Sequence, residues 1–489
     1  MPESEHPSIA VTVAPGDGIG PEITEATLRV LGAAGAPIAP EFVDIGLRPY
    51  EAGHGSGIPP AAWDSIRRTR VLLKGPVTTP QGSGFKSVNV TLRKTLGLYA
   101  NVRPCVSYHP FVRTLHPKLD VVIVRENEED LYAGIEHRQT DEVYQCLKLV
   151  TRPGCERIMR HAFAYARANG RRRITCMTKD NIMKMTDGLF HRVFDEFARL
   201  HPDIECEHQI IDIGAARLAT RPERYDVIVT LNLYGDILSD IAAELSGSVG
   251  LAPSSNIGDH AAMFEAIHGS APDIAGRGIA NPSGLLLAAV QMLVHLGQPE
   301  VAARVHNAWL TAIEDGVQTA DLMGNLGIGR PFGSMDFADA VIDRLGQRPR
   351  QLAAVDYTRA AAASETAPPE AAAMPRRADK RLVGVDVFVH RSGGTADALA
   401  QALQAAATGP MRLQMITNRG VKVWPDGLPE TFCSDHWRCR FAVGEGGSIT
   451  HRDIVDLLGR VTAAGIDCIK TENLCTFDGE RGYALGQGQ

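Results

Sequence analysis

The sequence feature that most limits the fold is a largely apolar run with two aspartates shortly after it. Residues 225–231 have the pattern of a strand that is buried on both faces of a parallel sheet. The next stretch, 232–240, reads Asn-Leu-Tyr-Gly-Asp-Ile-Leu-Ser-Asp and places Asp236 and Asp240 four positions apart. On a helix that begins near Gly235, both carboxylates lie on one face. The pattern predicts an α/β protein with two acids beside the end of a strand.

The two aspartates allow two interpretations. Like charges so close together are unfavourable unless a positive charge lies between them, and a hard divalent cation such as Mg²⁺ or Mn²⁺ takes oxygen ligands of this kind. Alternatively, Asp236 caps the helix and Asp240 is a solvated surface acid. This stretch alone does not decide between a metal site and a helix cap.

Length and charge limit the class of protein. The 489 residues allow roughly two to four domains. A formal net charge of −7 argues against a nucleic-acid-binding surface, and no apolar run is long enough to span a membrane. The nine cysteines contain no CxxC pair, and the acidic N-terminus lacks the apolar core of a signal peptide. We therefore expect a cytoplasmic protein with reduced thiols.

A glycine-rich turn follows the first predicted strand, residues 9–14. Gly16, Gly18 and Gly20 have the spacing GxGxG, and Pro21 opens the helix that follows. A dinucleotide-binding fingerprint requires GxGxxG, so this turn is a poor match. We expect a tight turn near a site and not a conventional Rossmann loop.

Basic residues recur where predicted strands end. Lys74 ends the apolar run 71–74, and Arg125 follows the run 121–124. Arg93 and Arg103 lie in similar positions between them. Each arginine alone could be a surface residue, but α/β sheets place their ligands at strand ends. Since the arginine fork binds carboxylates bidentately, the set predicts a site for a polyanion.

Five ordered motifs, at residues 75–80, 87–93, 125–134, 232–240 and 268–281, together resemble the β-decarboxylating dehydrogenases. That family includes isocitrate, isopropylmalate, homoisocitrate and tartrate dehydrogenases, and the resemblance spans roughly residues 8–350. It implies a two-domain α/β fold that is not a Rossmann fold. Residues 1–100 and 248–350 would form a large coenzyme-binding domain, and 101–247 a small domain with the dimer interface and an arm. The active cleft would lie between them in a homodimer or larger homo-oligomer, with residues from two subunits.

The resemblance also assigns roles to individual residues. Asp236 and Asp240 would bind the metal together with Asp212 of the partner subunit. Lys179 would reach in from the other subunit, and either Lys179 or Asp212 would take the hydroxyl proton, while Tyr132 would protonate the product carbon. The substrate ligands would be Lys74, Ser87, Asn89, Arg93, Arg103 and Arg125. The coenzyme ligands would be Thr79, Asn181, Glu265, His268, Gly269, Ser270, Ala271, Asp273, Ile274, Asn281 and Asp321.

The choice of substrate depends on the helix that carries Arg93. Ser87 and Asn89 offer a hydroxyl and an amide where isopropylmalate requires an apolar contact for its branched chain. Leaving either buried polar group unpaired would cost about 1–3 kcal/mol, whereas a γ-carboxylate would pair with both. We expect oxidative decarboxylation of isocitrate to 2-oxoglutarate and CO₂.

Four positions bear on the coenzyme. A carboxylate at Asp273 accepts hydrogen bonds from a free ribose 2'-hydroxyl but repels a 2'-phosphate. NADP-dependent members of the family carry Lys and Tyr at the positions of Asp273 and Ile274. They carry a further Tyr, and often Arg, at the positions of Ala320 and Gly324. We therefore expect NAD, with NADP as the alternative.

The remainder of the chain departs from the minimal family. Residues 351–380 have the composition of an extended or disordered linker, and 381–489 are expected to form a small α+β domain. Predicted strands at 382–389, 411–416 and 437–443 alternate with helices at 396–406 and 453–464. The region resembles a C-terminal extension of some bacterial isocitrate dehydrogenases, which usually carry the NADP-type Lys-Tyr pair. We expect it to make subunit contacts, and an effector-binding role is a hypothesis.

Two other functions fit parts of the sequence. A regulatory chain of the same fold would lack parts of the metal or Tyr/Lys set, all of which stand here. A sibling dehydrogenase for isopropylmalate, homoisocitrate or tartrate remains an alternative, against which Ser87 and Asn89 argue.

Overall fold

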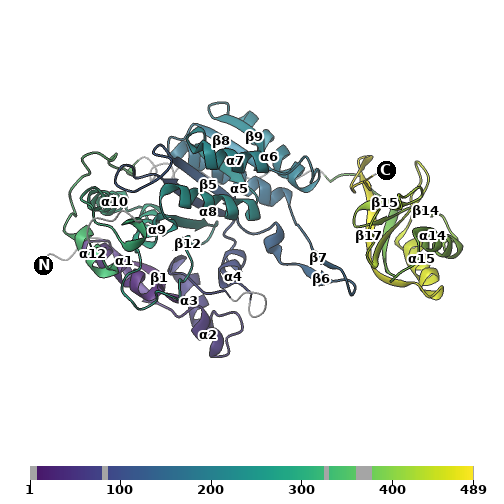
Figure 1. Ribbon diagram of the computed structural model, residues 1–489, viewed down its shortest axis with the longest axis horizontal. Coiled ribbons are helices and arrows are strands. Elements are labelled where there is room, and N and C mark those ends of the chain that lie inside the picture. Colours follow the sequence, from purple (N-terminus) through teal and green to yellow (C-terminus); the bar gives the residue numbers. More distant parts are fainter. Residues whose placement is uncertain (1–7, 80–85, 324–329, 359–376, 488–489) are drawn as a thin grey trace. The chain divides into compact units, whose positions relative to one another are not determined.

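The computed structural model describes residues 8–79, 86–323, 330–358 and 377–487. Contacts within the chain define two compact units (Figure 1). The first contains residues 1–133 and 148–370, and the second contains residues 134–147 and 371–489. None of the described helices is long and apolar enough to cross a membrane.

A ten-stranded mixed sheet forms the centre of the first unit. Four strands pair in parallel at each end, whereas the two middle strands, β11 and β4, pair antiparallel with both of their neighbours. The antiparallel pairing of β11 and β4 distinguishes this sheet from a wholly parallel Rossmann sheet. The alternation of strands and helices along the chain confirms the predicted α/β class. In sheet order the strands are β2 (Ile38–Phe42), β1 (Ile9–Ala14), β3 (Val71–Lys74), β12 (Ala262–Ala266), β11 (Pro253–Ile257), β4 (Ala100–Val106), β5 (Asp120–Glu126), β10 (Val227–Thr230), β8 (Arg173–Thr178) and β9 (Glu205–Ile210).

Helices pack against this sheet and form more than one apolar core with it. One core joins β1, β3 and β12 to α1, α9 and α10, and a second joins β5, β8 and β10 to α5 and α6. The division into two domains near residues 100 and 248 stays a prediction. The helices are α1 (Gly20–Ala33), α2 (Leu47–Glu51), α3 (Pro60–Thr69), α4 (Val88–Thr95), α5 (Arg152–Ala168), α6 (Thr186–Leu200), α7 (Ile211–Thr220), α8 (Asn232–Ser246), α9 (Ser283–His295), α10 (Pro299–Glu314), α11 (Ala320–Met323) and α12 (Ser334–Ile342), with 3₁₀ turns η1 (Leu131–Ala133), η2 (Pro222–Arg224) and η3 (Val249–Leu251).

The second unit contains a six-stranded antiparallel sheet with two helices packed on it (Figure 1). Its order is β15 (Val421–Trp424), β14 (Arg412–Asn418), β16 (His436–Ala442), β13 (Lys380–His390), β17 (Asp467–Phe477) and β18 (Glu480–Arg481), and the helices are α14 (Ala396–Ala406) and α15 (His451–Ala463). Every strand and helix predicted there is confirmed, and β15, β17 and β18 were missed. Inside the sheet, Arg440 is buried and pairs with Asp386 at 2.8 Å.

A hairpin of β6 (Glu136–Arg138) and β7 (Tyr144–Cys146) belongs to the second unit although it lies far earlier in the sequence. Thr140 donates its hydroxyl hydrogen to Oδ1 of Asp435 at 2.5 Å. The backbone N–H of Asp435 in turn donates to Oε2 of Glu142 at 3.0 Å. The predicted arm is therefore a short hairpin that is hydrogen-bonded to the C-terminal sheet.

The predicted start of the helix beside the site was wrong. Helix α8 begins at Asn232 and not near Gly235, because the chain leaves the extended conformation already after Leu231. Gly235 serves packing: a Cβ atom there would lie 2.5 Å from Cγ of Arg125. Elsewhere, β9 stops at Ile210, and Asp212 lies in the first turn of α7.

The predicted linker was wrong at its beginning. Residues 351–358 pack against α10, where Asn307 donates to the carbonyl of Val355 at 3.0 Å and the hydroxyl of Tyr357 lies 2.6 Å from Nδ1 of His306. At its other end, β13 already begins at Lys380. Residues 359–376 lie outside the described part of the chain.

Candidate active site

A cavity of about 400 Å³ opens where β3 and β12 end, beside β4, α4 and α8. Strands place basic side chains on it, and the first turns of α8 add acidic ones. Most of the predicted substrate, metal and catalytic residues meet here. The lining includes Lys74, Ser87, Asn89, Arg93, Arg103, Tyr132, Asp236, Asp240, Glu265, His268 and Gly269.

The acidic side of the cavity centres on Asp236. Its carboxylate forms ion pairs with Arg125 and, at 3.3 Å, with Arg103, and it accepts the hydroxyl hydrogen of Tyr132. Burial raises the pKa of Asp236, but the two guanidinium groups outweigh it and the net pKa is lowered. One turn later, burial raises the pKa of Asp240, whose Oδ1 lies 3.7 Å from Arg103. Asp236 is thus held by arginines and not by a helix-cap hydrogen bond, whereas the side chain of Asp240 is 65% exposed, as the alternative interpretation expected.

The basic side centres on a buried acid, Glu265. Lys74 lies 2.8 Å from one of its oxygens and Arg93 lies 2.9 Å from the other. Burial raises the pKa of Glu265, yet the two cations lower it well below its ordinary value. Glu265 was predicted as a coenzyme ligand, whereas here it neutralises two of the predicted substrate ligands.

Three buried polar atoms around the cavity have no hydrogen-bond partner within the described residues. They are Oδ1 of Asn89 and Nε of Arg93 and of Arg103. Buried polar atoms are almost always paired in folded proteins. Ser87 caps α4 by accepting from the backbone N–H of Val90. The unpaired atoms indicate that a polar ligand completes this cavity.

The residues of the cavity fit a divalent cation. Asp236 and Asp240 present only carboxylate oxygens, which suit the hard ions Mg²⁺ and Mn²⁺. These two acids supply part of an oxygen shell, to which a third ligand and water remain to be added.

The other predicted catalytic pair does not line the cavity. Nζ of Lys179 lies 2.9 Å from Oδ1 of Asp212, and that hydrogen bond lowers the pKa of Asp212. The side chain of Asp212 is 67% exposed. Asn181, two residues after Lys179, is also exposed. The structure of one chain thus brings Lys179 and Asp212 together with each other and not with Asp236.

The segment predicted to hold the coenzyme packs on the glycine-rich turn. The carbonyl of Ser270 accepts from the backbone N–H of Ile19 at 2.9 Å, and a Cβ atom at Gly18 would lie 1.9 Å from that carbonyl oxygen. The hydroxyl of Ser270 lies 2.8 Å from that of Thr78. The turn is tight, as expected, and it contacts the segment that is predicted to hold the coenzyme.

The remaining predicted coenzyme residues lie in several parts of the first unit. Asn281 donates to Asp321 at 3.0 Å, and Asp321 also accepts from Ser248. Asp273 is exposed. Gly324 lies outside the described residues. Of the others, Ala271 has a positive φ of 38°, Ile274 packs on the first core, and the hydroxyl of Thr79 donates to Ser87 at 3.5 Å.

Two residues with supporting roles were missed. Asn232 accepts from Nε and Nη2 of Arg125 at 3.1 and 2.8 Å, which fixes the guanidinium beside Asp236. Asp17 accepts from the backbone N–H groups of Leu47 and Thr78, which holds the loop after β3. Asn232 stands in the motif that also contains Asp236, so its position was a signal for its role.

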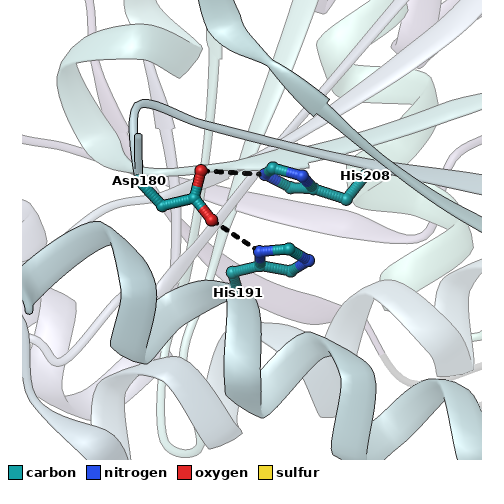
Figure 2. A group of neighbouring side chains, drawn as sticks. All are labelled: Asp180, His191 and His208. Atoms are coloured by element: carbon teal, nitrogen blue, oxygen red, sulfur yellow. Dashed lines mark hydrogen bonds and ion pairs between the residues drawn. The ribbon is translucent and has the colours of Figure 1, made fainter. Parts of the chain in front are cut away.

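Asp180, between Lys179 and Asn181 in the sequence, lies beside two histidines (Figure 2). One of its oxygens is 2.7 Å from Nδ1 of His191, and the other is 3.8 Å from Nε2 of His208. The two rings stack with their centroids 3.6 Å apart and 16° between their planes. Since imidazole binds a metal in the plane of its ring, nearly parallel rings cannot both point at one ion. We interpret the group as hydrogen bonding that fixes the loop of Lys179.

Comparisons with known proteins agree with this geometry. Residues 10–341 match the isocitrate/isopropylmalate dehydrogenase family, and residues 380–489 match the bacterial isocitrate dehydrogenase C-terminal domain. An isocitrate dehydrogenase (NADP) of Rickettsia bellii is 53% identical, over 98% of this chain and 99% of its own. Isocitrate dehydrogenase (NAD) subunit 2 of Schizosaccharomyces pombe is 44% identical, over 68% and 87%. A crystal structure of a Thermus thermophilus protein aligns with a TM-score of 0.91 at 45% identity, over 98% and 96%.

Proposed function

The chain belongs to the isocitrate/isopropylmalate dehydrogenase family, and we propose that it oxidises and decarboxylates isocitrate to 2-oxoglutarate and CO₂ with reduction of NAD. The observation that carries this proposal is the cavity in which arginines, Ser87 and Asn89 face Asp236 and Asp240. A tricarboxylic acid carries negative charges that the arginines of this lining can bind. Its γ-carboxylate would contact Asn89 in one of two ways: through a water that donates to the unpaired Oδ1, or directly through the amide N–H groups if the side-chain amide is turned over.

The residues of the chain divide the work of binding and proton transfer. Arg93, Arg103 and Arg125 bind the carboxylates of the substrate. When bound, a divalent cation held by Asp236 and Asp240 supplies Lewis-acid stabilisation of the developing negative charge. Burial, followed by the neighbouring Asp236, raises the pKa of Tyr132. Tyr132 therefore stays protonated at neutral pH and can donate its proton to the carbon that has lost CO₂.

The proton acceptor comes from a second copy of the chain. Within one chain, Lys179 and Asp212 pair with each other and do not line the cavity. They can serve the site only if the Lys179 and Asp212 of a second subunit lie at the cavity of the first. Large apolar side chains beside them are exposed: Ile182 and Met185 near Lys179, and Ile213 next to Asp212. On α8, Ile237 between the two acids is 52% exposed. Exposed apolar groups around a half-complete site favour a homodimer, which buries them.

NAD is the coenzyme that the residues favour. Asp273 places an exposed carboxylate after the 268–272 segment, and Ala320 offers no group to bind a phosphate. NADP is the alternative, and it is favoured by the name of the full-length Rickettsia relative. We also propose a cytoplasmic setting, with which nine cysteines that contain no CxxC pair accord.

One assay tests these proposals. Purified protein is given isocitrate with either NAD or NADP and either Mg²⁺ or Mn²⁺, and an EDTA-treated sample serves as the control. We expect turnover with isocitrate, its loss on chelation and a higher kcat/KM with NAD. Turnover of 3-isopropylmalate but not of isocitrate would overturn the proposed substrate. A higher kcat/KM with NADP would overturn the assignment of Asp273 alone.

A further inference from the structure

Lys148 is a buried lysine between two buried aspartates. Its Nζ lies 2.9 Å from Oδ1 of Asp130 and 3.1 Å from Oδ1 of Asp187. Both carboxylates are fully buried, and the lysine side chain is 12% exposed. The ammonium group also lies 4.7 Å from the ring centroid of Tyr234. Lys148 does not line the cavity, so it contacts no substrate there.

Lys148 neutralises the negative charges of Asp130 and Asp187. Among the described residues, it is the one basic side chain within 4.0 Å of either carboxylate. Oδ1 of Asp130 and Oδ1 of Asp187 have no hydrogen-bond partner there, so each depends on this ion pair. Removing one member of a buried charge group leaves an uncompensated charge in the interior, which is strongly unfavourable. Without Lys148, two like charges would face each other in a region of low dielectric.

The second oxygen of Asp187 holds the loop of Lys179. Oδ2 accepts from the backbone N–H of Lys179 at 2.7 Å and from the hydroxyl of Tyr234 at 3.2 Å. Tyr234 lies in the first turn of α8. A single carboxylate thus ties the start of the loop after β8 to the helix that carries Asp236.

The second oxygen of Asp130 holds the start of α8 directly. Oδ2 accepts from the backbone N–H of Leu233 at 2.9 Å. Asp130 itself has a φ of +63°, a left-handed conformation that non-glycine residues seldom adopt. Two residues later, Tyr132 lies in η1. The ion pair with Lys148 therefore fixes the residue that turns the chain toward Tyr132.

We propose that Lys148 is a positioning residue, which holds the segments of Tyr132, Lys179 and α8 in one arrangement through Asp130 and Asp187. The inference rests on the proposed function for the roles of Tyr132, Lys179 and Asp236. A misplacement of about 1 Å at reacting groups can cost about 10²-fold in rate. Lys148 thereby sets the rate of the reaction without touching the substrate.

The central test compares Lys148→Met with Arg440→Met. Arg440 also pairs with a buried aspartate, but in the C-terminal sheet, so it controls for the loss of a buried ion pair. We expect Lys148→Met to lower kcat about 10- to 100-fold and to shift the pH profile of kcat, with a smaller change in KM. Arg440→Met should lower Tm without changing kcat. If Lys148→Met lowers Tm but leaves kcat and its pH profile unchanged, the residue only stabilises the fold and the proposal is wrong.

Two further variants keep the test decisive if Lys148→Met does not fold. Lys148→Arg preserves the charge and should recover most of kcat. Asp187→Asn keeps an acceptor for the N–H of Lys179 but loses the ion pair, and should lower kcat several-fold with a shifted pH profile. Wild-type kinetics in Asp187→Asn would show that the charge group has no role in positioning.

Hydrogen–deuterium exchange separates this inference from the proposed function. In Lys148→Met or Asp187→Asn, peptides spanning 178–184 and 231–236 should exchange faster than in the wild type, whatever substrate the enzyme uses. In Arg440→Met they should exchange as in the wild type. Unchanged exchange would overturn the inference, whereas a wild-type protein that does not oxidise isocitrate would overturn only the proposed function.

Discussion

Asp236 and Asp212 share a proposed role as metal ligands, but their surroundings differ sharply. Asp236 is two-thirds buried and touches Arg103, Arg125 and Tyr132, whereas Asp212 is largely exposed and touches Lys179. Burial and dense pairing preorganise the first region within one chain. The second region keeps its groups at the surface, where a second copy can reach them. If the two regions serve one site as proposed, Asp236 and its partners are in place once the chain folds, whereas Lys179 and Asp212 join them only when a second subunit binds.

The largest expected effect comes from Asp236→Asn, which removes the charge at the centre of the buried half. Two arginines would lose their counterion, and the cation would lose a ligand. We expect kcat/KM to fall about 10³-fold, in the range for removing a group that stabilises developing charge, and Mn²⁺ binding to weaken. Steady-state kinetics and a Mn²⁺ titration measure both.

The matched control is Asp203→Asn, which removes an exposed aspartate paired with Arg167. It should leave kcat/KM unchanged. Retention of more than about a tenth of the activity by Asp236→Asn would contradict a central role for this acid.

Mixing two inactive variants sharpens the comparison most directly. If Lys179 and Asp236 serve one site from different subunits, a hybrid of Lys179→Met and Asp236→Asn contains one intact site. Random exchange of subunits should then restore about a quarter of the wild-type activity. Activity after refolding the mixture, relative to each variant refolded alone, is the measurement. If the mixture is as inactive as its components, the site is not shared.

A moderate effect is expected from Asn89→Leu on the substrate side. The γ-carboxylate of isocitrate would lose a polar partner, which corresponds to about 1–3 kcal/mol. The kcat/KM for isocitrate should fall about 10- to 100-fold, mainly through KM. Thr91→Val on the same helix is the control, since its hydroxyl bonds only to the carbonyl of Ser87. An equal loss in both variants would indicate damage to α4 instead of a lost contact.

The smallest effect concerns the coenzyme. Asp273→Lys replaces a carboxylate that repels a 2'-phosphate with a cation that attracts it. The ratio of kcat/KM for NADP to that for NAD should rise about 10-fold. Glu430→Lys makes the same charge change at an exposed position of the second unit and should leave the ratio unaltered. No change in Asp273→Lys would remove Asp273 from the coenzyme site.

Regular elements were predictable where their pattern was unbroken. The run 71–74 is β3, and the predicted helix 396–406 is α14 residue for residue. In contrast, β17 contains Asp467, Lys470 and Glu472, and these charges hide its alternation. The start of α8 was misplaced because Gly235, taken as a boundary, instead makes room for Arg125.

The site was predictable as a set of residues but not as a set of contacts. The sequence indicated that arginines and aspartates converge. It could not indicate that Glu265 neutralises Lys74 and Arg93, because that pairing joins β3, α4 and β12 in space. Lys148 was missed for the same reason, since a single lysine in an apolar stretch has no local pattern.

The hydrogen bonds between the 136–146 hairpin and Asp435 have a practical consequence for anyone shortening this chain. A truncation after residue 350 would remove more than an appended domain. It would strip the hairpin of its companion sheet and leave Thr140 facing water, between Tyr132 on one side in sequence and Lys148 on the other. The segment that looks dispensable on a linear map is therefore hydrogen-bonded to a hairpin that lies between Tyr132 and Lys148 in the sequence.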